Sequence, residues 1–455
     1  MKYAVFLAGL VLLVPAGILA SSYSRRVREC VFFALVFFTA FTDRCDINFL
    51  ERWWYAGSTR GFEFSIVDLF ALILLMSTVV TLRREGGRIF WPASLAPMLI
   101  YFAYASFTVA VSNPKLFGMF EIVKLLRGML VFIAVAWFIR SRRDAYILLY
   151  ALSAVLIYNG CLAVLQRYVW SIYRVYGTFP HSNILGDYCC LTAPLLLAIA
   201  LSGERRTIKA FCTAAWTLGA VATILTIARM PSVVFLATSA GALIAGHGAR
   251  VDARKTALLL ILATVVCGIF YRGLDALEER HQADRTAAAF KPEGGRTGFY
   301  RVGWMMAKDH PFGVGLNNWG WYYHLYCHWA GDDTSRPYSS TAEPGDGRAT
   351  QGHTLYGLTL GELGWPGLLI SLLLWFRWLS IAGRHFFVRN SELWTLIGIG
   401  CFFGFLAEFL ANTTEITFRN QQIFMLFNIM TGLAVAAHRM TFAASAYELR
   451  GGAYR

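Results

Sequence analysis

Residues 393–411, LWTLIGIGCFFGFLAEFLA, show the pattern that decides the fold of this chain. About 20 consecutive apolar residues are enough for an α-helix to cross a hydrocarbon core of roughly 30 Å. Such runs recur along the 455 residues, of which 57% are hydrophobic and 15% are charged. A soluble domain has about 25% charged residues. The sequence therefore predicts an all-α, polytopic integral membrane protein.

The hydrophobic runs predict about 12–13 transmembrane helices. The count stays open because the tight turn at Arg229-Met230-Pro231 allows its two neighbouring runs to form a re-entrant pair. The expected spans are residues 3–20, 30–46, 64–82, 93–112, 119–139, 144–166, 182–202, 209–228, 231–247, 256–272, 354–376, 393–411 and 421–437.

Clusters of Lys and Arg indicate how these helices are oriented. They fall on every second short loop, and cytoplasmic loops carry an excess of these residues. We therefore expect a multi-pass membrane protein with these clusters on the cytoplasmic side. The formal net charge of +14 arises mainly in these loops, beside anionic lipid headgroups, so it does not indicate binding to nucleic acid. The clusters begin at Arg25, Arg83, Arg140, Arg205, Arg250 and Arg377.

One long segment divides the chain into three parts. Residues 1–272 contain the first ten expected helices, residues 273–352 form a large loop, and residues 353–455 contain the last helices and a cytoplasmic tail. The orientation places the large loop on the outer side of the membrane, which is the periplasm if the source is a Gram-negative bacterium. Loops of this length are usually functional.

The large loop contains expected elements of its own. Residues 274–290 are predicted to form a polar surface helix, and residues 297–308 an amphipathic helix that ends at Asp309-His310-Pro311. The aromatic residues between 319 and 329 are typical of a helix at the membrane interface, or of a stacking surface for sugar rings. Residues 331–350 are expected to form an irregular loop.

The large loop closes on His353, which directly precedes a hydrophobic run. A neutral histidine can accept a proton at neutral pH. Arg229 and Arg301 lie on the same side of the membrane, with Arg296 as an alternative to Arg301, and a guanidinium group binds phosphate oxygens in a bidentate manner. Each of these residues also has a structural explanation, such as a solvated charge or an arginine that reaches the membrane surface.

Three further charged residues are candidates for a headgroup site. Lys124 and Arg127 lie three residues apart within one expected span, where a charge either serves a function or pairs with a neighbour. Glu121 is the nearest such neighbour of Lys124. Arg419, with Asn412 and Glu415, lies in the last outer loop, where the three could complete a site.

Motifs for several other chemistries are absent from the sequence. There is no Gly-Lys-Ser/Thr loop for nucleotide phosphates and no His-Glu-x-x-His pair for zinc. Adjacent outer carboxylates have no histidine or third carboxylate at ligand spacing. We therefore expect no metal site and no cofactor.

The chain resembles the bacterial O-antigen ligase and O-antigen polymerase superfamily of membrane glycan transferases. Residues 177–183, GTFPHSN, precede a span as in many members. Residues 301–319, with Arg301, Trp304 and DHPFGVGLNNW, resemble the Arg–Trp–Pro–Gly-x-Gly segment of the family's large outer loop. Residues 353–369 resemble its His-x-x-Leu…Glu-Leu-Gly-x-x-Gly-Leu helix.

The resemblance covers roughly residues 177–440, and Arg229 falls where the family has an arginine after a preceding span. Ala228 replaces the usual serine before it, and Thr354 replaces a common Asn or Ser. Neither change removes a charged or basic group. The first half of the chain matches mainly in hydropathy.

The resemblance implies a GT-C-like, metal-independent glycosyltransferase of the bacterial inner membrane, with its active site facing the periplasm. Such enzymes move a glycan from an undecaprenyl-diphosphate carrier to a hydroxyl of another glycan or of a lipid-linked core. His353 would be the catalytic base, and Arg229 with Arg301 or Arg296 would bind the diphosphate. Inversion at the anomeric carbon would follow from direct displacement.

Two other functions remain open. A polysaccharide transporter or lipid flippase would explain the many spans and the charges at Lys124 and Arg127, but it predicts internal repeats, and none is visible. A membrane scaffold would leave the outer arginines unexplained. The sequence does not distinguish ligase activity from polymerase activity.

Overall fold

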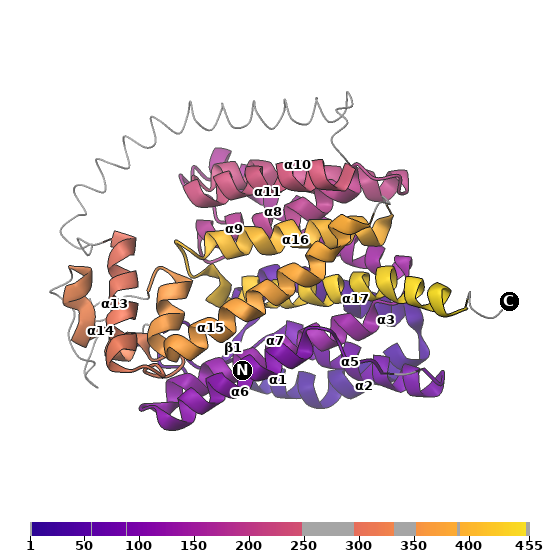
Figure 1. The fold of residues 1–455 in the computed structure, drawn as a ribbon. Helices are drawn as coiled ribbons and strands as arrows, with labels where there is room; N and C mark the ends of the chain where they lie inside the picture. Colours follow the sequence, from indigo (N-terminus) through magenta and orange to yellow (C-terminus); the bar gives the residue numbers. More distant parts are fainter. Residues whose placement is uncertain are drawn as a thin grey trace.

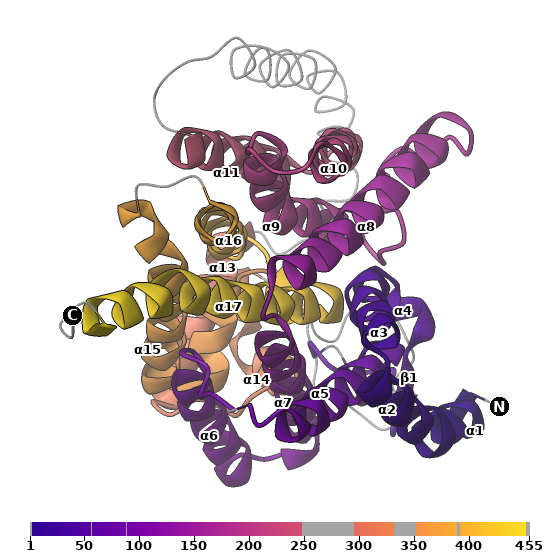
Figure 2. The same cartoon turned by 90° about the vertical axis from the view of Figure 1, so that its right-hand side faces the viewer.

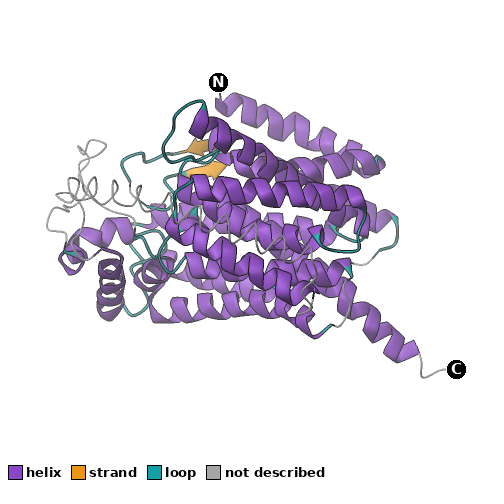
Figure 3. Cartoon of the chain, turned by 90° about the horizontal axis from the view of Figure 1, so that it is seen from above, coloured by secondary structure: helices purple, strands orange, loops and turns teal. Residues whose placement is uncertain are grey.

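The computed structural model describes residues 2–55, 57–87, 89–247, 295–331, 352–388 and 392–451. Long helices run roughly side by side through the molecule, and a few short helices lie at one end (Figures 1 and 3). Within the described residues, nine helices are long and apolar enough to cross a membrane. The predicted all-α, polytopic fold is therefore confirmed.

Eight of the nine are single helices or helices that continue into a short turn, and the ninth is the N-terminal segment Phe6–Tyr23. That segment comprises parts of α1 (Lys2–Ala8), a π-helical stretch η1 (Gly9–Leu13) and α2 (Val14–Tyr23). The others are α5 (Ile66–Arg84), α8 (Arg142–Tyr168), α9 (Ser182–Ala200), α10 (Arg206–Leu225), α11 (Arg229–His247), α15 (Leu355–Gly383), α16 (Leu393–Ala411) and α17 (Gln421–Gly451).

Three more helices overlap predicted spans. They are α3 (Arg25–Phe37), α6 (Leu95–Val111) and α7 (Lys115–Phe138). The first two are shorter than the rest, and α7 carries more charge, which keeps all three outside the group of nine. α10 and α11 each belong to that group, which favours two separate crossings over a re-entrant pair. The predicted span 256–272 and the predicted polar helix 274–290 lie outside the described residues.

Helix α9 forms the centre of one half of the bundle and packs against α10, α11 and α16 (Figure 2). Two glycines of α16 permit its close approach to α9. A Cβ atom at Gly400 would lie 2.4 Å from the Cα atom of Leu195, and one at Gly404 would lie 2.3 Å from the carbonyl oxygen of Leu191. Small residues at such contacts are common between membrane helices. Because Gly400 lies against Leu195 and Gly404 against Leu191, the two helices are antiparallel.

The arginine-rich loops meet at one end of the bundle. Arg25 forms an ion pair with Asp144 at 3.3 Å, and Arg143 forms one with Glu29 at 2.6 Å. Ser141 caps α8 together with Asp144. Two of the loops expected in the cytoplasm thus share one surface, which lies away from the short helices α13 and α14 (Figure 1).

The opposite end carries the described part of the large loop. It consists of α13 (Gly295–Asp309), α14 (Trp319–Tyr326) and the 3₁₀ turn η4 (Cys327–Ala330). The predicted amphipathic helix and its end at Asp309 are confirmed. Its apolar face packs against α15 around a small hydrophobic core that includes Phe299, Val302, Met306, Trp319, Tyr323 and Leu358.

A kink in α15 receives the turn that follows α13. Gly364 has a φ of 67°, and Pro366 lacks the N–H group that would bond within the helix. The kink leaves backbone carbonyl groups without helical partners, and the turn supplies donors for them. Val314 N–H donates to the Gly361 oxygen at 3.0 Å, and Gly315 N–H donates to the Glu362 oxygen at 2.9 Å. The outer segment and the transmembrane helix are therefore locked together.

A two-stranded antiparallel sheet completes the outer end. It pairs β1 (Ile47–Phe49) with β2 (Phe62–Phe64). The loop between the strands is fixed by Asn317, which accepts from Ser58 N–H at 2.8 Å and donates to the Thr59 oxygen at 2.8 Å. The loop between β1 and β2 and the segment after α13 are thus packed together as one unit.

Candidate functional site

His353 stands immediately before the N-cap of α15, at the outer end of the bundle. Its side chain is exposed, and its ring lies 5.3 Å from that of Phe299 on α13, centroid to centroid. The start of α15 is fixed because Leu355 N–H donates to the carbonyl oxygens of Asn412 and Glu415 at 3.1 and 3.0 Å. Sequence elements far apart in the chain therefore hold this imidazole in place.

The electrostatic surroundings of His353 favour its neutral form. Partial shielding from water, and then the positive charge of Arg296, lower the pKa of His353 from its usual value of 6.5. A neutral imidazole has a nitrogen lone pair that can take a proton. The residue is thus ready to act as a base at neutral pH.

Arg296 reaches the same region from the first turn of α13. It forms an ion pair with Glu415, which lies between α16 and α17, while its own side chain stays 50% exposed. Tyr300, one turn further along, donates from its hydroxyl to the Thr413 oxygen at 2.8 Å. This face of α13 therefore lies against the last outer loop, next to His353.

Glu415 connects Arg296 to the segment that precedes α9. The Asn183 amide donates to the same Glu415 oxygen at 3.0 Å, and Arg174 donates to the Asn183 amide oxygen at 3.0 Å. Burial raises the pKa of Glu415, and the charge of Arg296 acts in the opposite direction. A buried carboxylate thus gathers an arginine and an amide from distant parts of the chain.

His181 caps the N-terminus of α9 beside this group. Its ring nitrogen accepts from Asn183 N–H at 3.1 Å. Burial and the charge of Arg174 lower the pKa of His181, and Glu415 and His353 are also near enough to affect it. The candidate site therefore comprises four segments, around residues 174–183, 296–300, 353–355 and 412–415.

The structure separates the two arginines that the sequence proposed for α13. An α-helix has about 3.6 residues per turn, so Arg301 projects away from the buried side chains of Phe299 and Val302. It is exposed, and it has no hydrogen bond or ion pair with any described residue. Arg296, the alternative to it, is the one that lies beside His353 and Glu415.

Arg229 is the first residue of α11 and is exposed. A Cβ atom at Gly186 of α9 would touch Pro231 at 2.6 Å, so α11 begins at the same level of the bundle as α9. Arg174 donates to the Thr226 oxygen at 3.3 Å, which ties the preceding turn to the site. Within the described part of the chain, Arg229 has no ion-pair partner.

The three charged residues proposed from the spans and from the last outer loop are paired inside the protein. Arg127 binds both carboxylate oxygens of Asp68, at 2.9 and 2.7 Å. Arg419 lies between Glu121 and Glu362, at 3.1 and 3.0 Å. All of these side chains are buried.

Lys124 completes the same network. It forms an ion pair with Glu121 at 3.3 Å and donates to the backbone oxygen of Arg419. The near neighbour expected from the sequence is therefore its partner. Two acidic and two basic groups, Glu121, Glu362, Lys124 and Arg419, balance each other, which leaves no net charge for a substrate headgroup.

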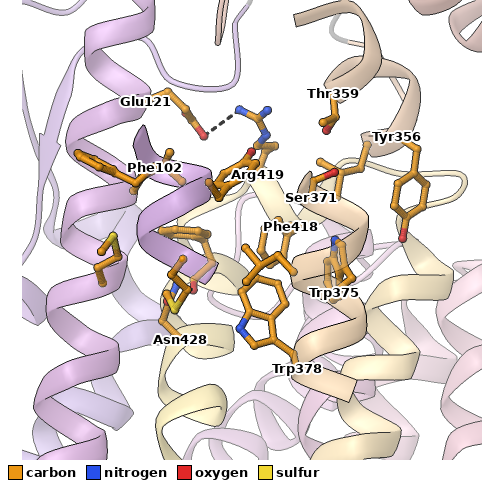
Figure 4. Close-up of a pocket in the computed structure, with 17 residues that line it drawn as sticks. Phe102, Glu121, Tyr356, Thr359, Ser371, Trp375, Trp378, Phe418, Arg419 and Asn428 are labelled. Atoms are coloured by element: carbon orange, nitrogen blue, oxygen red, sulfur yellow. Dashed lines mark hydrogen bonds and ion pairs between the residues drawn. The ribbon is translucent and has the colours of Figure 1, made fainter. Parts of the chain in front are cut away.

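A pocket lies beside the candidate site and extends into the bundle (Figure 4). The volume of the pocket is about 760 Å³, which includes space open to the outside. Leu355 and Tyr356, from the first turn of α15, line one part of it, and Trp375 and Trp378, beyond the kink, line another. The paired Arg419 and Glu121 also contribute to its wall. Most of the lining is apolar, as in a site for a lipid chain.

One residue of the group, Arg174, was not anticipated from the sequence. Its signal was a positive charge on the outer side, against the usual distribution, a few residues before the GTFPHSN segment. Asn183 and His181 belong to that segment, but their contact with Glu415 depends on the fold.

The family comparison matches this part of the chain. Residues 213–372 match a family model described as O-antigen ligase. This stretch includes Arg229, α13, His353 and the kinked α15. No curated protein matches the chain. The match and the membrane-spanning architecture support a function in membrane glycan transfer. Residues 213–372 thus resemble an O-antigen ligase domain, which supports the resemblance of the chain to the O-antigen ligase and polymerase superfamily.

Proposed function

We propose that this protein is a glycosyltransferase that moves a glycan from an undecaprenyl-diphosphate carrier to an acceptor hydroxyl. The reaction takes place on the periplasmic face of a bacterial inner membrane. The observation that carries the proposal is the position of His353, exposed at the start of α15 and within electrostatic reach of Arg296. A base and a cation at one membrane surface suit a donor whose leaving group is a diphosphate.

Arg296 is the main contact for the diphosphate. One of its terminal nitrogens binds Glu415, and a guanidinium group has five N–H donors. The remaining donors can bind phosphate oxygens while Glu415 holds the side chain in position. Arg229, at the start of α11, is the second cation of the proposed clamp. Together they would neutralise the charge that grows on the leaving group.

The apolar pocket extends the same site into the membrane. Leu355 lies two residues after His353 and lines this pocket. A diphosphate beside His353 would therefore leave its isoprenoid chain close to a surface of aromatic and aliphatic side chains. The carrier chain is the occupant that this lining suits best.

The chemistry is a direct displacement. The acceptor oxygen attacks the anomeric carbon, the bond between that carbon and the phosphate oxygen breaks, and undecaprenyl diphosphate leaves with the electron pair. His353 takes the proton from the acceptor hydroxyl. One attack from the opposite face inverts the anomeric centre. Because the arginines balance the charge of the leaving group, the reaction is proposed to need no metal ion.

The transporter alternative has less support. It was suggested by intramembrane charges at Lys124 and Arg127, but both are bound in buried ion pairs. Charges that are fully paired inside the fold serve its stability.

The test uses the purified protein in lipid with an oligosaccharide linked to a lipid diphosphate, with and without candidate acceptors. A ladder of products indicates polymerase activity, and a single addition indicates ligase activity. The His353→Ala variant is expected to lower the transfer rate by about 10²–10⁴-fold, the usual contribution of one general base, without lowering thermal stability.

His310 offers a matched control for this test. It is also an exposed histidine of the outer segment, and its ring contacts Tyr322 at 5.8 Å. The His310→Ala variant should transfer glycan at close to the wild-type rate. Equal rates in the wild type and in His353→Ala would exclude His353 as the base.

A further inference from the structure

Two acidic residues face each other inside the bundle, directly below the candidate site. The contacts between α9 and α16 pair Gly400 with Leu195 and Gly404 with Leu191. One further helical turn in each direction pairs Glu408 with position 187, which is an aspartate. Asp187 is 0% exposed and Glu408 is 1% exposed.

The two carboxylates have too few hydrogen-bond donors. Glu408 Oε1 accepts from the Asn412 amide at 2.7 Å and from the Thr417 hydroxyl at 3.4 Å. Glu408 Oε2 and both carboxylate oxygens of Asp187 have no hydrogen-bond partner among the described residues. The Thr417 hydroxyl lies near Asp187 as well, but its single hydrogen already serves Glu408.

No basic side chain of the described residues is near enough to offset either charge. The titratable groups around the pair, taken over every packed element that the structure describes, are Glu415 on the last outer loop, the thiols of Cys189 and Cys190 on α9, and the phenol of Tyr356 on α15. α10, α11 and α17 contribute none. Two buried carboxylates in such surroundings cannot both be ionised, because each raises the cost of charging the other.

We propose that Asp187 and Glu408 form a binding site for one proton, and that the protonated pair positions the last outer loop under the catalytic site. With one proton bound, an O–H group on Asp187 donates to Glu408 Oε2. One hydrogen bond then joins a carboxyl oxygen of Asp187 and Glu408 Oε2, two atoms that otherwise lack a partner. The pair remains with a single negative charge, which Asn412 and Thr417 already bind through Glu408 Oε1.

This pair acts on the proposed site through the loop above it. Besides binding Glu408, Asn412 accepts the N–H of Leu355 at the start of α15, and its side-chain oxygen accepts from Phe418 N–H at 3.2 Å. The same loop carries Glu415, which holds Arg296. Loss of the proton would place two negative charges side by side and push the loop away. Asp187 and Glu408 are therefore positioning residues, and this role rests on the proposed function.

The first test is spectroscopic and needs no activity. Infrared spectra of the purified protein in lipid should show the carbonyl absorption of a protonated carboxyl group at neutral pH. The band should disappear in Asp187→Asn and in Glu408→Gln. It should remain in Asp68→Asn, the matched control, because Arg127 donates to both carboxylate oxygens of Asp68. Absence of the band in the wild type, or its persistence in both pair variants, would overturn the proposal.

The second test follows glycan transfer as a function of pH. In the wild type, transfer should fall at alkaline pH as the pair loses its proton. Asn at position 187 supplies N–H donors to Glu408 without titrating, so Asp187→Asn should fold and lose this alkaline limb. Glu408→Gln provides the same comparison if Asp187→Asn does not fold. An unchanged alkaline limb in the variants would contradict the proposal.

A third measurement separates a proton from a metal cation. Transfer should be the same when sodium is replaced by choline at constant ionic strength, and a requirement for sodium would overturn the assignment of a proton. If the protein transfers no glycan at all, the proposed function fails, but the infrared result still decides whether the pair holds a proton.

Discussion

The charged residues inside the bundle and those at its outer end are alike in type but differ in what surrounds them. Arg419, Lys124 and Arg127 are buried, and carboxylates neutralise each of them. Arg296 is half exposed, and His353 is exposed beside it. A buried charge requires a partner at once, because desolvation is costly. Burial within the protein therefore indicates a need for neutralisation, and accessibility indicates a capacity to bind substrate.

The largest expected effect is on stability, from removing a buried cation. Arg419→Ala would leave Glu121 and Glu362 together without their shared partner. Breaking a buried ion pair by removing one member costs about 3–5 kcal/mol, so the variant should unfold at a clearly lower temperature in detergent. Arg301→Ala is the control, because it removes an exposed arginine that has no ion-pair partner among the described residues. Equal unfolding temperatures for both variants would remove the distinction between the two regions.

A smaller effect is expected at the kink that joins the two regions. Gly364 has a φ of 67° and a ψ of −168°, a conformation that is essentially confined to glycine. A Cβ atom there would also lie 2.1 Å from the Pro311 oxygen. Gly364→Ala should cost about 1–3 kcal/mol from the backbone conformation alone, measured by thermal unfolding. Loss of the docked turn should lower transfer too.

Gly203 provides the comparison for this substitution, since a Cβ atom there would meet open space. Gly203→Ala should leave both unfolding and transfer close to the wild type. If Gly364→Ala behaves in the same way, the kink does not couple the outer segment to the bundle.

The smallest expected effect is a shift in pH dependence. His353 must be neutral to accept a proton, so kcat/KM should fall as the pH drops through its pKa, which lies below 6.5. Arg296 is one of the causes of that lowered pKa. In Arg296→Ala the pKa of His353 should rise, and the acidic limb of the kcat/KM profile should move to higher pH. Arg301→Ala should leave the limb in place, and a shift of equal size in both variants would contradict the assignment.

The apolar runs predicted the membrane-crossing helices, of which nine are found among the described residues, because hydrophobic length depends on local composition. The end of α13 at Asp309 was equally local, since His310 and Pro311 follow it. Pro366 is a local signal for the kink in α15, but the partners of its free carbonyl groups were not predictable, because Val314 and Gly315 lie about 50 residues earlier in the chain. Helix breaks in membranes depend on such distant partners.

The candidate site was predictable in part. The motif around His353 and the outer arginines identified the region. The choice between Arg296 and Arg301 depends on which face of α13 meets the last outer loop, and only the fold determines it. Arg127 was a candidate for binding the substrate headgroup, because no residue close to it in the sequence identifies its partner. That partner, Asp68, lies 59 residues earlier in the chain. A single sequence does not show that residues this far apart form an ion pair.

The most direct test of the central claim compares two arginines of the same helix. Equilibrium binding of a lipid-diphosphate-linked oligosaccharide is measured for the wild type, Arg296→Ala and Arg301→Ala. Hydrogen bonds to charged groups contribute about 1.5–3 kcal/mol, so Arg296→Ala should weaken binding by about 10–100-fold, with poor rescue by Arg296→Lys. Arg301→Ala should bind like the wild type. Unchanged binding in Arg296→Ala, or an equal loss in both variants, would contradict a diphosphate site beside His353.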